Sequence, residues 1–238
     1  MKLEKQQVIV FGGSSGIGLA AARRALAEGA SVTLVGTSQE RLEAAAAALG
    51  THVRTHVCDV RDEGAVEQVF ANFTSVDHVV NTAGGVGGAP KLQGPMAVLM
   101  EPIHTRLQGS IAIAKHAIPK LRAGGSVTFF SGAGQSKPFP ASATTLASAG
   151  AVEILSRALA VEAAPIRFNT ISPGLVDTPL LRSFFPDNAA ESIAAWSSKF
   201  PVPRAAQADE VADALNFLMT NVYVTGETLV IDGGWRWT

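Results

Sequence analysis

Hydrophobic residues fall along this chain in short runs, which alternate with longer segments where apolar positions recur every three or four residues. A short apolar run predicts a buried strand, and the longer period predicts an amphipathic helix. The expected strands are Gln7–Phe11, Ser31–Val35, Thr51–Val57, His78–Asn81, Ser126–Phe130, Ile166–Ile171 and Thr228–Ile231. The expected helices are Gly16–Glu28, Gln39–Leu49, Glu63–Phe73, about Ile103–Leu121, about Thr145–Ala163 and Ala208–Met219. This alternation predicts an α/β fold with a seven-stranded parallel sheet flanked by helices.

A single domain spanning residues 1–238 accounts for the pattern, because no linker-like stretch divides the chain. The segment 179–206 is the one long insertion between expected core elements. It carries Phe184, Phe185, Trp196 and Phe200. These aromatic side chains predict an apolar lid over a substrate rather than a flexible linker.

Composition and charge exclude several kinds of partner. Hydrophobic residues make up 47% of the chain, the formal net charge is −1, and no basic run occurs. We therefore expect neither nucleic acid nor a membrane surface as a partner. Cys58 is the only cysteine, which rules out an internal disulfide and favours a cytoplasmic location. The five histidines show no metal-ligand grouping, and no metal is expected.

A glycine-rich loop, Gly12-Gly13-Ser14-Ser15-Gly16-Ile17-Gly18, lies between the first expected strand and the first expected helix. Glycine permits a tight turn and lets the backbone approach a pyrophosphate closely. The helix that follows offers free N–H groups and a partial positive charge at its N-terminus. A strand before the loop and a helix after it are the context that gives such a motif its meaning, so the loop predicts a dinucleotide site.

Several further motifs follow in a fixed order. They are Cys58-Asp59-Val60, Asn81-Thr82-Ala83-Gly84, the stretch Asn169 to Pro179, Thr225-Gly226-Glu227 and Asp232-Gly233-Gly234. Together with the glycine loop they resemble the short-chain dehydrogenase/reductase family over almost the full length. The resemblance implies a doubly wound Rossmann-type fold that binds NAD(P). It also implies contacts of Asp59 with adenine and of the stretch from Pro173 to Thr178 with the nicotinamide carboxamide.

The resemblance and the loop together give a set of expected cofactor-binding residues. They are Gly12, Ser14, Ser15, Gly16, Ile17, Gly18, Thr37, Ser38, Asp59, Val60, Asn81, Ala83, Gly84, Pro173, Gly174, Val176 and Thr178. Phe11 stands where the family usually has a threonine before the first glycine, a small departure from the pattern.

The catalytic positions of the family pattern are altered. In typical members a tyrosine donates a proton to the substrate oxygen, and a lysine lowers its pKa and holds the ribose. Matching the helix from Ala149 to Ala160 without gaps puts Thr145 on the tyrosine position and Ala149 on the lysine position. A threonine alcohol is a far weaker acid than tyrosine, and alanine can shift no neighbour's pKa. The usual proton chemistry is therefore absent.

Three residues remain as candidates for catalysis: Ser131, Arg106 and Thr145. Ser131 follows the fifth strand, but its spacing to Thr145 is one residue longer than in the family, so Gly132 is an alternative for the serine position. Arg106 falls on the position of the family's asparagine. As a permanent cation it can stabilise a developing oxyanion or hold a substrate carboxylate. A solvated or interface arginine on the long helix is the alternative.

The end of the second strand indicates which dinucleotide binds. An acidic residue there favours NAD, whereas a basic one favours the 2′-phosphate of NADP. Here the chain has Gly36, Thr37 and Ser38, followed by Arg41, with no acid to repel a phosphate. We therefore favour NADP(H) over NAD(H). The stretch Thr37 to Glu40 also has the spacing of a capping box, a second role for Thr37.

Two functions from different classes fit these features. The first is an NADP(H)-dependent oxidoreductase with a non-standard active site, acting on an unidentified carbonyl, alcohol or activated-alkene substrate. The alternative is a catalytically inactive dinucleotide sensor or oligomer partner, which the loss of the tyrosine and lysine suggests. The intact stretch from Pro173 to Thr178 favours the first, because a sensor of adenine alone has no need of it. In the family the two long helices form a dimer interface, so we expect a homodimer or homotetramer.

Overall fold

A computed structural model describes residues 1–50, 53–84, 92–139 and 142–238. Its main sheet has seven strands in the order β3-β2-β1-β4-β5-β6-β9, and every neighbouring pair is parallel. The strands are β1 Gln7–Phe11, β2 Ser31–Gly36, β3 Val53–Val57, β4 Val76–Asn81, β5 Leu121–Phe130, β6 Arg167–Pro173 and β9 Thr228–Ile231. The predicted seven-stranded parallel sheet is confirmed.

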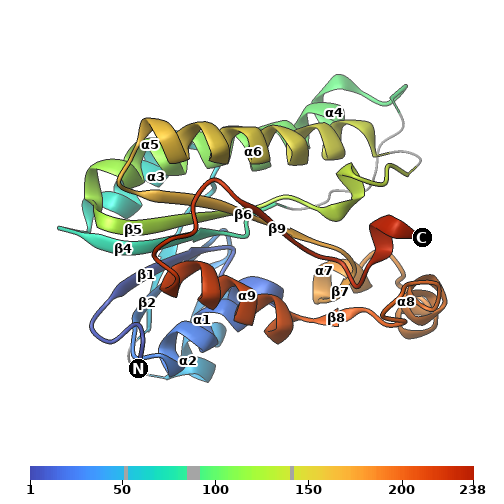
Figure 1. Cartoon of the computed structure of the whole chain (residues 1–238), viewed down its shortest axis with the longest axis horizontal. Coiled ribbons are helices and arrows are strands. Elements are labelled where there is room, and N and C mark those ends of the chain that lie inside the picture. The colour runs from blue at the N-terminus through green and yellow to red at the C-terminus, as the bar shows by residue number, and fades with distance from the viewer. Residues whose placement is uncertain (51–52, 85–91, 140–141) are drawn as a thin grey trace.

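Helices cover both faces of this sheet, as a doubly wound fold requires (Figure 1). On one side lie α1 Gly16–Ala27, α2 Gln39–Leu49 and α9 Ala208–Thr220; on the other lie α3 Glu63–Ala71, α5 Gly109–Ala117 and α6 Ala143–Glu162. Each layer encloses its own core, with Val10 and Leu34 in one and Val79 and Phe168 in the other. The chain crosses from one face to the other after β3, and the strand order in the sheet reverses between the neighbouring strands β1 and β4.

The long helix expected at Ile103–Leu121 takes a more irregular form. It begins earlier, as α4 Met96–Pro102, and passes through the π-helical turn η1 Ile103–Gln108 before α5 and the short 3₁₀ turn η2 Ile118–Lys120. Pro102 has no N–H to donate to the turn before it, which disfavours a regular continuation. The wider π turn follows immediately, a feature common at functional sites. Leu121 belongs to β5, not to the helix.

Smaller boundary differences also occur. β4, β5 and β6 are longer than the apolar runs predicted, and the first two residues of the strand expected at Thr51–Val57 lie outside the described residues. The predicted capping box at Thr37 is wrong by one residue. Ser38 is the N-cap of α2, and its hydroxyl accepts a hydrogen bond from the backbone N–H of Arg41 at 3.3 Å. Thr37 therefore has no capping role.

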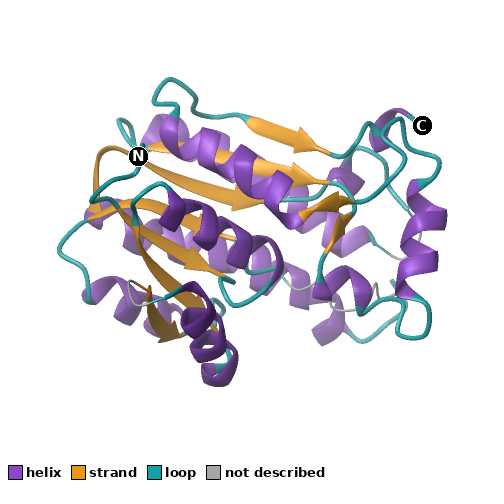
Figure 2. Cartoon of the chain, turned by 90° about the horizontal axis from the view of Figure 1, so that it is seen from below, coloured by secondary structure: helices purple, strands orange, loops and turns teal. Residues whose placement is uncertain are grey.

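The segment predicted as a lid forms α7 Pro179–Arg182 and α8 Ala189–Ser197 beyond the carboxyl ends of the strands (Figure 2). A small parallel pair, β7 Val176–Asp177 and β8 Ala206–Gln207, brackets it. Its apolar side chains join a third hydrophobic cluster that includes Phe200 and Trp235. Among the described helices only α6 is long and apolar enough to cross a bilayer; here it packs against β6 and η1.

Candidate active site

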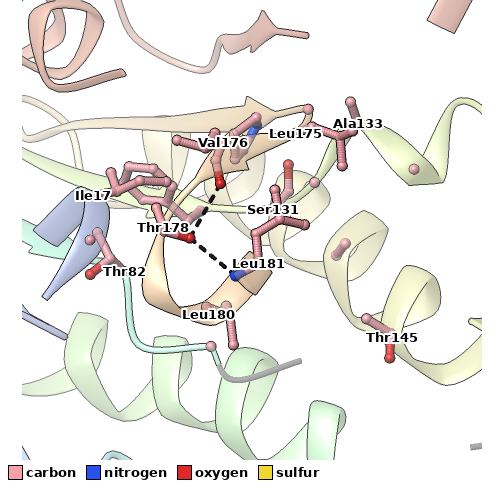
Figure 3. A pocket seen from close by; sticks show the side chains of 18 of the residues that line it. Ile17, Thr82, Ser131, Ala133, Thr145, Leu175, Val176, Thr178, Leu180 and Leu181 are labelled. Carbon is pink, nitrogen blue, oxygen red and sulfur yellow. Dashed lines mark hydrogen bonds between the residues drawn. The ribbon is translucent and has the colours of Figure 1, made fainter. Parts of the chain in front are cut away.

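A cavity of about 390 Å³ opens at the carboxyl ends of β1, β4, β5 and β6 (Figure 3). This is where open α/β sheets bind their ligands. The glycine loop and the turn after β4 form one wall, and the loops after β5 and β6 form another. α6 and the lid complete it. The cavity is therefore built from segments far apart in the sequence that the sheet brings together.

The glycine loop packs too closely for side chains. A Cβ atom on Gly18 would lie 2.2 Å from the carbonyl oxygen of Gly12 and 2.7 Å from the hydroxyl of Thr82. Gly12 and Gly16 have φ angles of 77° and 52°, in the left-handed region that favours glycine. Ser15, the N-cap of α1, makes no side-chain capping bond. The first N–H groups of α1 thus remain available to an anion.

The turn after β4 is fastened to this loop. Thr82 donates from its hydroxyl to the carbonyl oxygen of Phe11 at 2.8 Å, and its backbone N–H donates to the same oxygen at 2.9 Å. Asn81 donates to the Ser110 hydroxyl at 3.2 Å and accepts from the N–H of Ala83 at 3.0 Å. Phe11 therefore leaves the loop and the turn well connected through its backbone.

The expected cofactor residues fall into two groups. Ten of them line the cavity: Ser15, Gly16, Ile17, Gly18, Ala83, Gly84, Pro173, Gly174, Val176 and Thr178. The others, Gly12, Ser14, Thr37, Ser38, Asp59, Val60 and Asn81, lie outside its lining, in or beside the glycine loop or at the ends of β2, β3 and β4. Thr178 also caps α7, accepting from the N–H of Leu181 at 3.3 Å (Figure 3). Thr178 thereby joins the stretch from Pro173 to Val176 to the first helix of the lid.

Asp59 has a strong partner of its own. Its carboxylate accepts from Nε of Arg61 at 3.0 Å and from the Arg61 backbone N–H at 2.9 Å, while Arg61 also donates to Glu101 at 2.7 Å. The hydrogen bonds from the Arg61 side chain hold the pKa of Asp59 below its ordinary value. Contact of Asp59 with adenine stays a prediction. The next residue, Val60, packs closely against Gly109. A Cβ atom on Gly109 would lie 2.8 Å from the Val60 side chain.

The surface beyond β2 carries no acidic side chain at Gly36, Thr37 or Ser38. Thr37 and Arg41 are exposed, and Ser14 lies close by, since a Cβ on Gly36 would be 3.7 Å from its hydroxyl oxygen. Within the described residues Arg41 has no ion-pair partner. Its charge is thus available at this end of the site.

Thr145 and Ala149 both lie on the wall of the cavity, as the match of α6 predicts. The Thr145 hydroxyl is buried and has no hydrogen-bond partner among the described residues. Its backbone carbonyl is occupied by two donors, the hydroxyl of Ser148 at 2.7 Å and Nη1 of Arg106 at 3.0 Å. The catalytic role of Thr145 stays a prediction.

Arg106 reaches into the cavity from η1. Its side chain is buried, and its Nη1 donates to the Thr145 carbonyl at 3.0 Å and to the Ser148 hydroxyl at 3.1 Å. Burial lowers the pKa of Arg106, but a guanidinium stays charged at any ordinary pH. The alternative of a solvated surface arginine is therefore wrong, and Arg106 is the only charged side chain of the described cavity lining.

Ser131 lines the cavity, but its hydroxyl donates to the carboxylate of Glu153 at 2.7 Å. Gln135 donates to the same carboxylate oxygen, and Arg157 lies 3.8 Å from the other. Gly132 also lines the cavity, and a Cβ there would meet nothing within 4 Å. The geometry thus leaves both alternatives for the serine position open. It gives Ser131 a definite role in joining the β5 loop to α6.

Two features of the site escaped sequence reasoning. Glu153 is a buried carboxylate on the core face of α6, although it reads as an ordinary surface residue. Phe139 and Trp235 complete an aromatic wall with Trp196, their ring centroids 6.0 to 6.4 Å apart. Trp235 packs within its own chain, and Lys137 donates to its carbonyl oxygen at 3.3 Å. The spacing of the aromatic residues contains no signal for this convergence.

His104 does not contribute to the site. It is exposed, bonds Gln108 at 2.8 Å and is not part of the cavity lining, whereas Arg106 is. Among residues 1–50, 53–84, 92–139 and 142–238, no group of three or more His, Cys, Asp or Glu side chains is placed to hold a metal ion.

A parallel sheet, a glycine loop at a helix N-terminus and a cavity at the strand ends define a dinucleotide-binding α/β protein. Residues 12–236 match a family model described as Enoyl-(Acyl carrier protein) reductase. The chain is 30% identical over 251 residues to the short-chain dehydrogenase/reductase malC of Malbranchea aurantiaca, covering 98% of this chain and 95% of that one. It is 31% identical over 233 residues to the human 3-oxoacyl-[acyl-carrier-protein] reductase, covering 94% and 95%. The chain belongs to the short-chain dehydrogenase/reductase family, whose relatives here are oxidoreductases.

Solved structures of related proteins have the same fold as this chain. The MalC reductase/Diels-Alderase from Malbranchea aurantiaca superposes with a TM-score of 0.92 at 27% identity, covering 100% of this chain and 98% of that one. A small-chain dehydrogenase in complex with NADPH gives a TM-score of 0.82 at 29% identity, covering 99% and 100%.

Proposed function

We propose that this protein is an NADP(H)-dependent oxidoreductase that transfers hydride to or from a largely apolar substrate with a carbonyl, alcohol or activated-alkene group. The observation that carries the proposal is the shape of the cavity. The glycine loop, with the turn after β4, and the Pro173–Thr178 stretch form two of its walls, and the aromatic side chains Phe139, Trp196 and Trp235 lie on the same cavity. A dinucleotide and a second molecule would thus meet in one cavity.

The residues present fit a dinucleotide. Gly18 allows close packing of α1 on the turn at Thr82, and the uncapped first turn of α1 has N–H groups for a pyrophosphate. NADPH rather than NADH is favoured by the exposed hydroxyl of Thr37 and by the free charge of Arg41. The NADPH complex of a related dehydrogenase is consistent with this preference.

When bound, the cofactor supplies or accepts the hydride. Arg106 would then stabilise the negative charge that develops on the substrate oxygen, because its guanidinium is buried and already held in place by α6. Water would supply the proton, since the Thr145 hydroxyl is buried and only weakly acidic. The aromatic wall would exclude bulk water from the rest of the substrate.

The relatives support redox chemistry on more than one kind of substrate. Their descriptions include a 3-oxoacyl-[acyl-carrier-protein] reductase and a reductase/Diels-Alderase. A reductase function therefore agrees with both of these relatives, whereas the substrate differs between them. We take the apolar lid of this chain as the guide to its own substrate.

Mutation of Arg106 tests the proposal. Arg106→Ala should lower the rate of NADPH oxidation by about 100-fold, because one preorganised donor contributes about 3 kcal/mol to the transition state. NADPH affinity should change much less. Arg23→Ala, at an exposed arginine of α1 outside the cavity lining, is the matched control. Equal turnover in Arg106→Ala and the wild type would remove Arg106 from the mechanism.

We also propose that the protein forms a homodimer or homotetramer through α5 and α6. Both helices present apolar side chains to solvent in the single chain: Ile111 on α5, and Ile154 and Val161 on α6. Such surface is usually covered by a partner. A monomer mass by light scattering at micromolar concentration would contradict this.

A further inference from the structure

Arg106 is a buried cation whose hydrogen-bond partners are all neutral. The residue is 8% exposed, and its partners are a backbone carbonyl and the Ser148 hydroxyl. Among the described residues no carboxylate lies within ion-pair distance of it. Burying a charge without a counterion is unfavourable, because the lost hydration is not replaced. The arrangement calls for an anion from outside the chain.

Within the part of the chain that the structure describes, no group covers the edge of the guanidinium that faces away from α6. Nε and Nη2 make no hydrogen bond within the described residues, whereas Nη1 makes two. Gly84 stands beside this edge, and a Cβ there would lie 3.4 Å from Nε and 3.6 Å from Nη2. Because Gly84 has no side chain, this residue leaves the edge uncovered. Two parallel N–H donors form the fork that binds a carboxylate in a bidentate way.

The rest of the described cavity wall offers no other charge. Beyond Arg106 it consists of glycines, small polar residues and apolar side chains, and its aromatic part is Phe130, Phe139, Phe184, Trp196 and Trp235. A ligand that satisfies both features has a flat or bulky apolar body and one negatively charged oxygen group at its end.

We propose that the substrate of this protein is an apolar, unsaturated or aromatic molecule with an anionic oxygen group, a carboxylate or an enolised dicarbonyl, bound by Arg106. The inference rests on the proposed function, and it adds the class of substrate. The charged oxygen lies against the fork formed by Nε and Nη2, and the apolar body lies along the aromatic wall. A substrate held in this way would present its conjugated carbon toward the Pro173–Thr178 side of the cavity.

A matched pair of probes tests this directly. Isothermal titration calorimetry with 2-naphthoate and its neutral isostere 2-naphthamide should show about 10- to 100-fold tighter binding of the anion to the wild type. Arg106→Gln should abolish the preference, and Arg106→Lys, which retains charge without the fork, should keep part of it. Arg23→Gln, at an exposed arginine of α1 that pairs with Asp209 outside the cavity lining, should leave the preference unchanged.

Three outcomes would overturn the inference: equal affinity for both probes, binding of neither, or a preference that survives Arg106→Gln. The diphosphate of the dinucleotide is the other possible source of the anion. If saturating NADP⁺ removes the preference for naphthoate, the anion at Arg106 is the cofactor's, and the substrate class is wrong. The Arg106→Lys variant keeps the test decisive if Arg106→Gln does not fold.

Hydride transfer is measured separately from this binding. A protein that oxidises NADPH but binds the two probes equally loses only the substrate class. A protein that prefers the anion but transfers no hydride to any acceptor retains its anion site and loses the proposed function.

Discussion

Acidification should destabilise this protein through His78, which lies buried on β4. Its Nδ1 is 2.8 Å from the Ser126 hydroxyl and its Nε2 is 2.7 Å from the side-chain oxygen of Gln6. A neutral imidazole satisfies both contacts, since Nε2–H donates to Gln6 and Nδ1 accepts from Ser126. Burial is the main cause that lowers the pKa of His78 from 6.5 to about 4, with the charge of Arg167 as a second cause.

The shift in the pKa of His78 determines how the free energy of unfolding changes with pH. The unfolded chain takes up a proton below pH 6.5, whereas the folded chain resists protonation until about pH 4. The folded state therefore has its full stability above pH 6.5 and loses it as the pH falls toward 4. Each pH unit in this window costs about 1.4 kcal/mol. Between pH 7.5 and pH 5 the loss is about 2 kcal/mol, which lowers Tm by roughly 4–8 °C for a chain of this length.

Urea unfolding at pH 7.5 and pH 5 measures this loss. His78→Gln should be less stable than the wild type at pH 7.5 but should lose about 2 kcal/mol less on acidification. His104→Gln is the matched control, because His104 is exposed. His56, whose pKa is also lowered by burial, should leave a smaller dependence of the free energy of unfolding on pH in the His78→Gln variant. An unchanged slope in His78→Gln would refute the assignment of the pH dependence to this residue.

Three further substitutions test the site, each with a control. Gly18→Ala should abolish NADPH binding because its Cβ would strike Gly12, whereas Gly132→Ala should be neutral; fluorescence titration compares them. Trp235→Ala should lower the free energy of unfolding by about 3–5 kcal/mol, while the exposed Trp237→Ala changes it little. Glu153→Gln should cost about 1–3 kcal/mol by weakening the bond from Ser131, measured by urea unfolding against the exposed Glu162→Gln. Equal effects of a variant and its control would contradict each prediction.

The fold could be predicted from the sequence because its signals are local. Buried parallel strands appear as continuous apolar runs such as Gln7–Phe11, and the glycine loop marks its own strand–turn–helix context. Strand ends were less well predicted. The first five residues of β5, Leu121–Gly125, include two glycines and lie where the register against β4 shifts, so they form no apolar run. The π turn at η1 carried no signal beyond Pro102.

The site could be predicted only in part. The match of α6 predicted that Thr145 and Ala149 occupy the tyrosine and lysine positions, and both lie on the cavity wall. The orientation of Ser131 toward Glu153 depends on a contact between residues 22 positions apart, which no local pattern encodes. The aromatic wall joins Phe139, Trp196 and Trp235 from three separate segments. Such convergence is a property of the fold rather than of any single stretch.

The most direct test of the account is a fluorescence titration of the wild-type protein with NADPH and NADH in parallel. The account predicts saturable binding of NADPH that is about tenfold or more tighter than that of NADH. It also predicts that Arg41→Ala reduces this difference, because Arg41, in the first turn of α2 after β2, has no ion-pair partner among the described residues. Equal binding of both would contradict the preference for NADP(H). Failure to bind either would contradict the central claim that the cavity is a dinucleotide site.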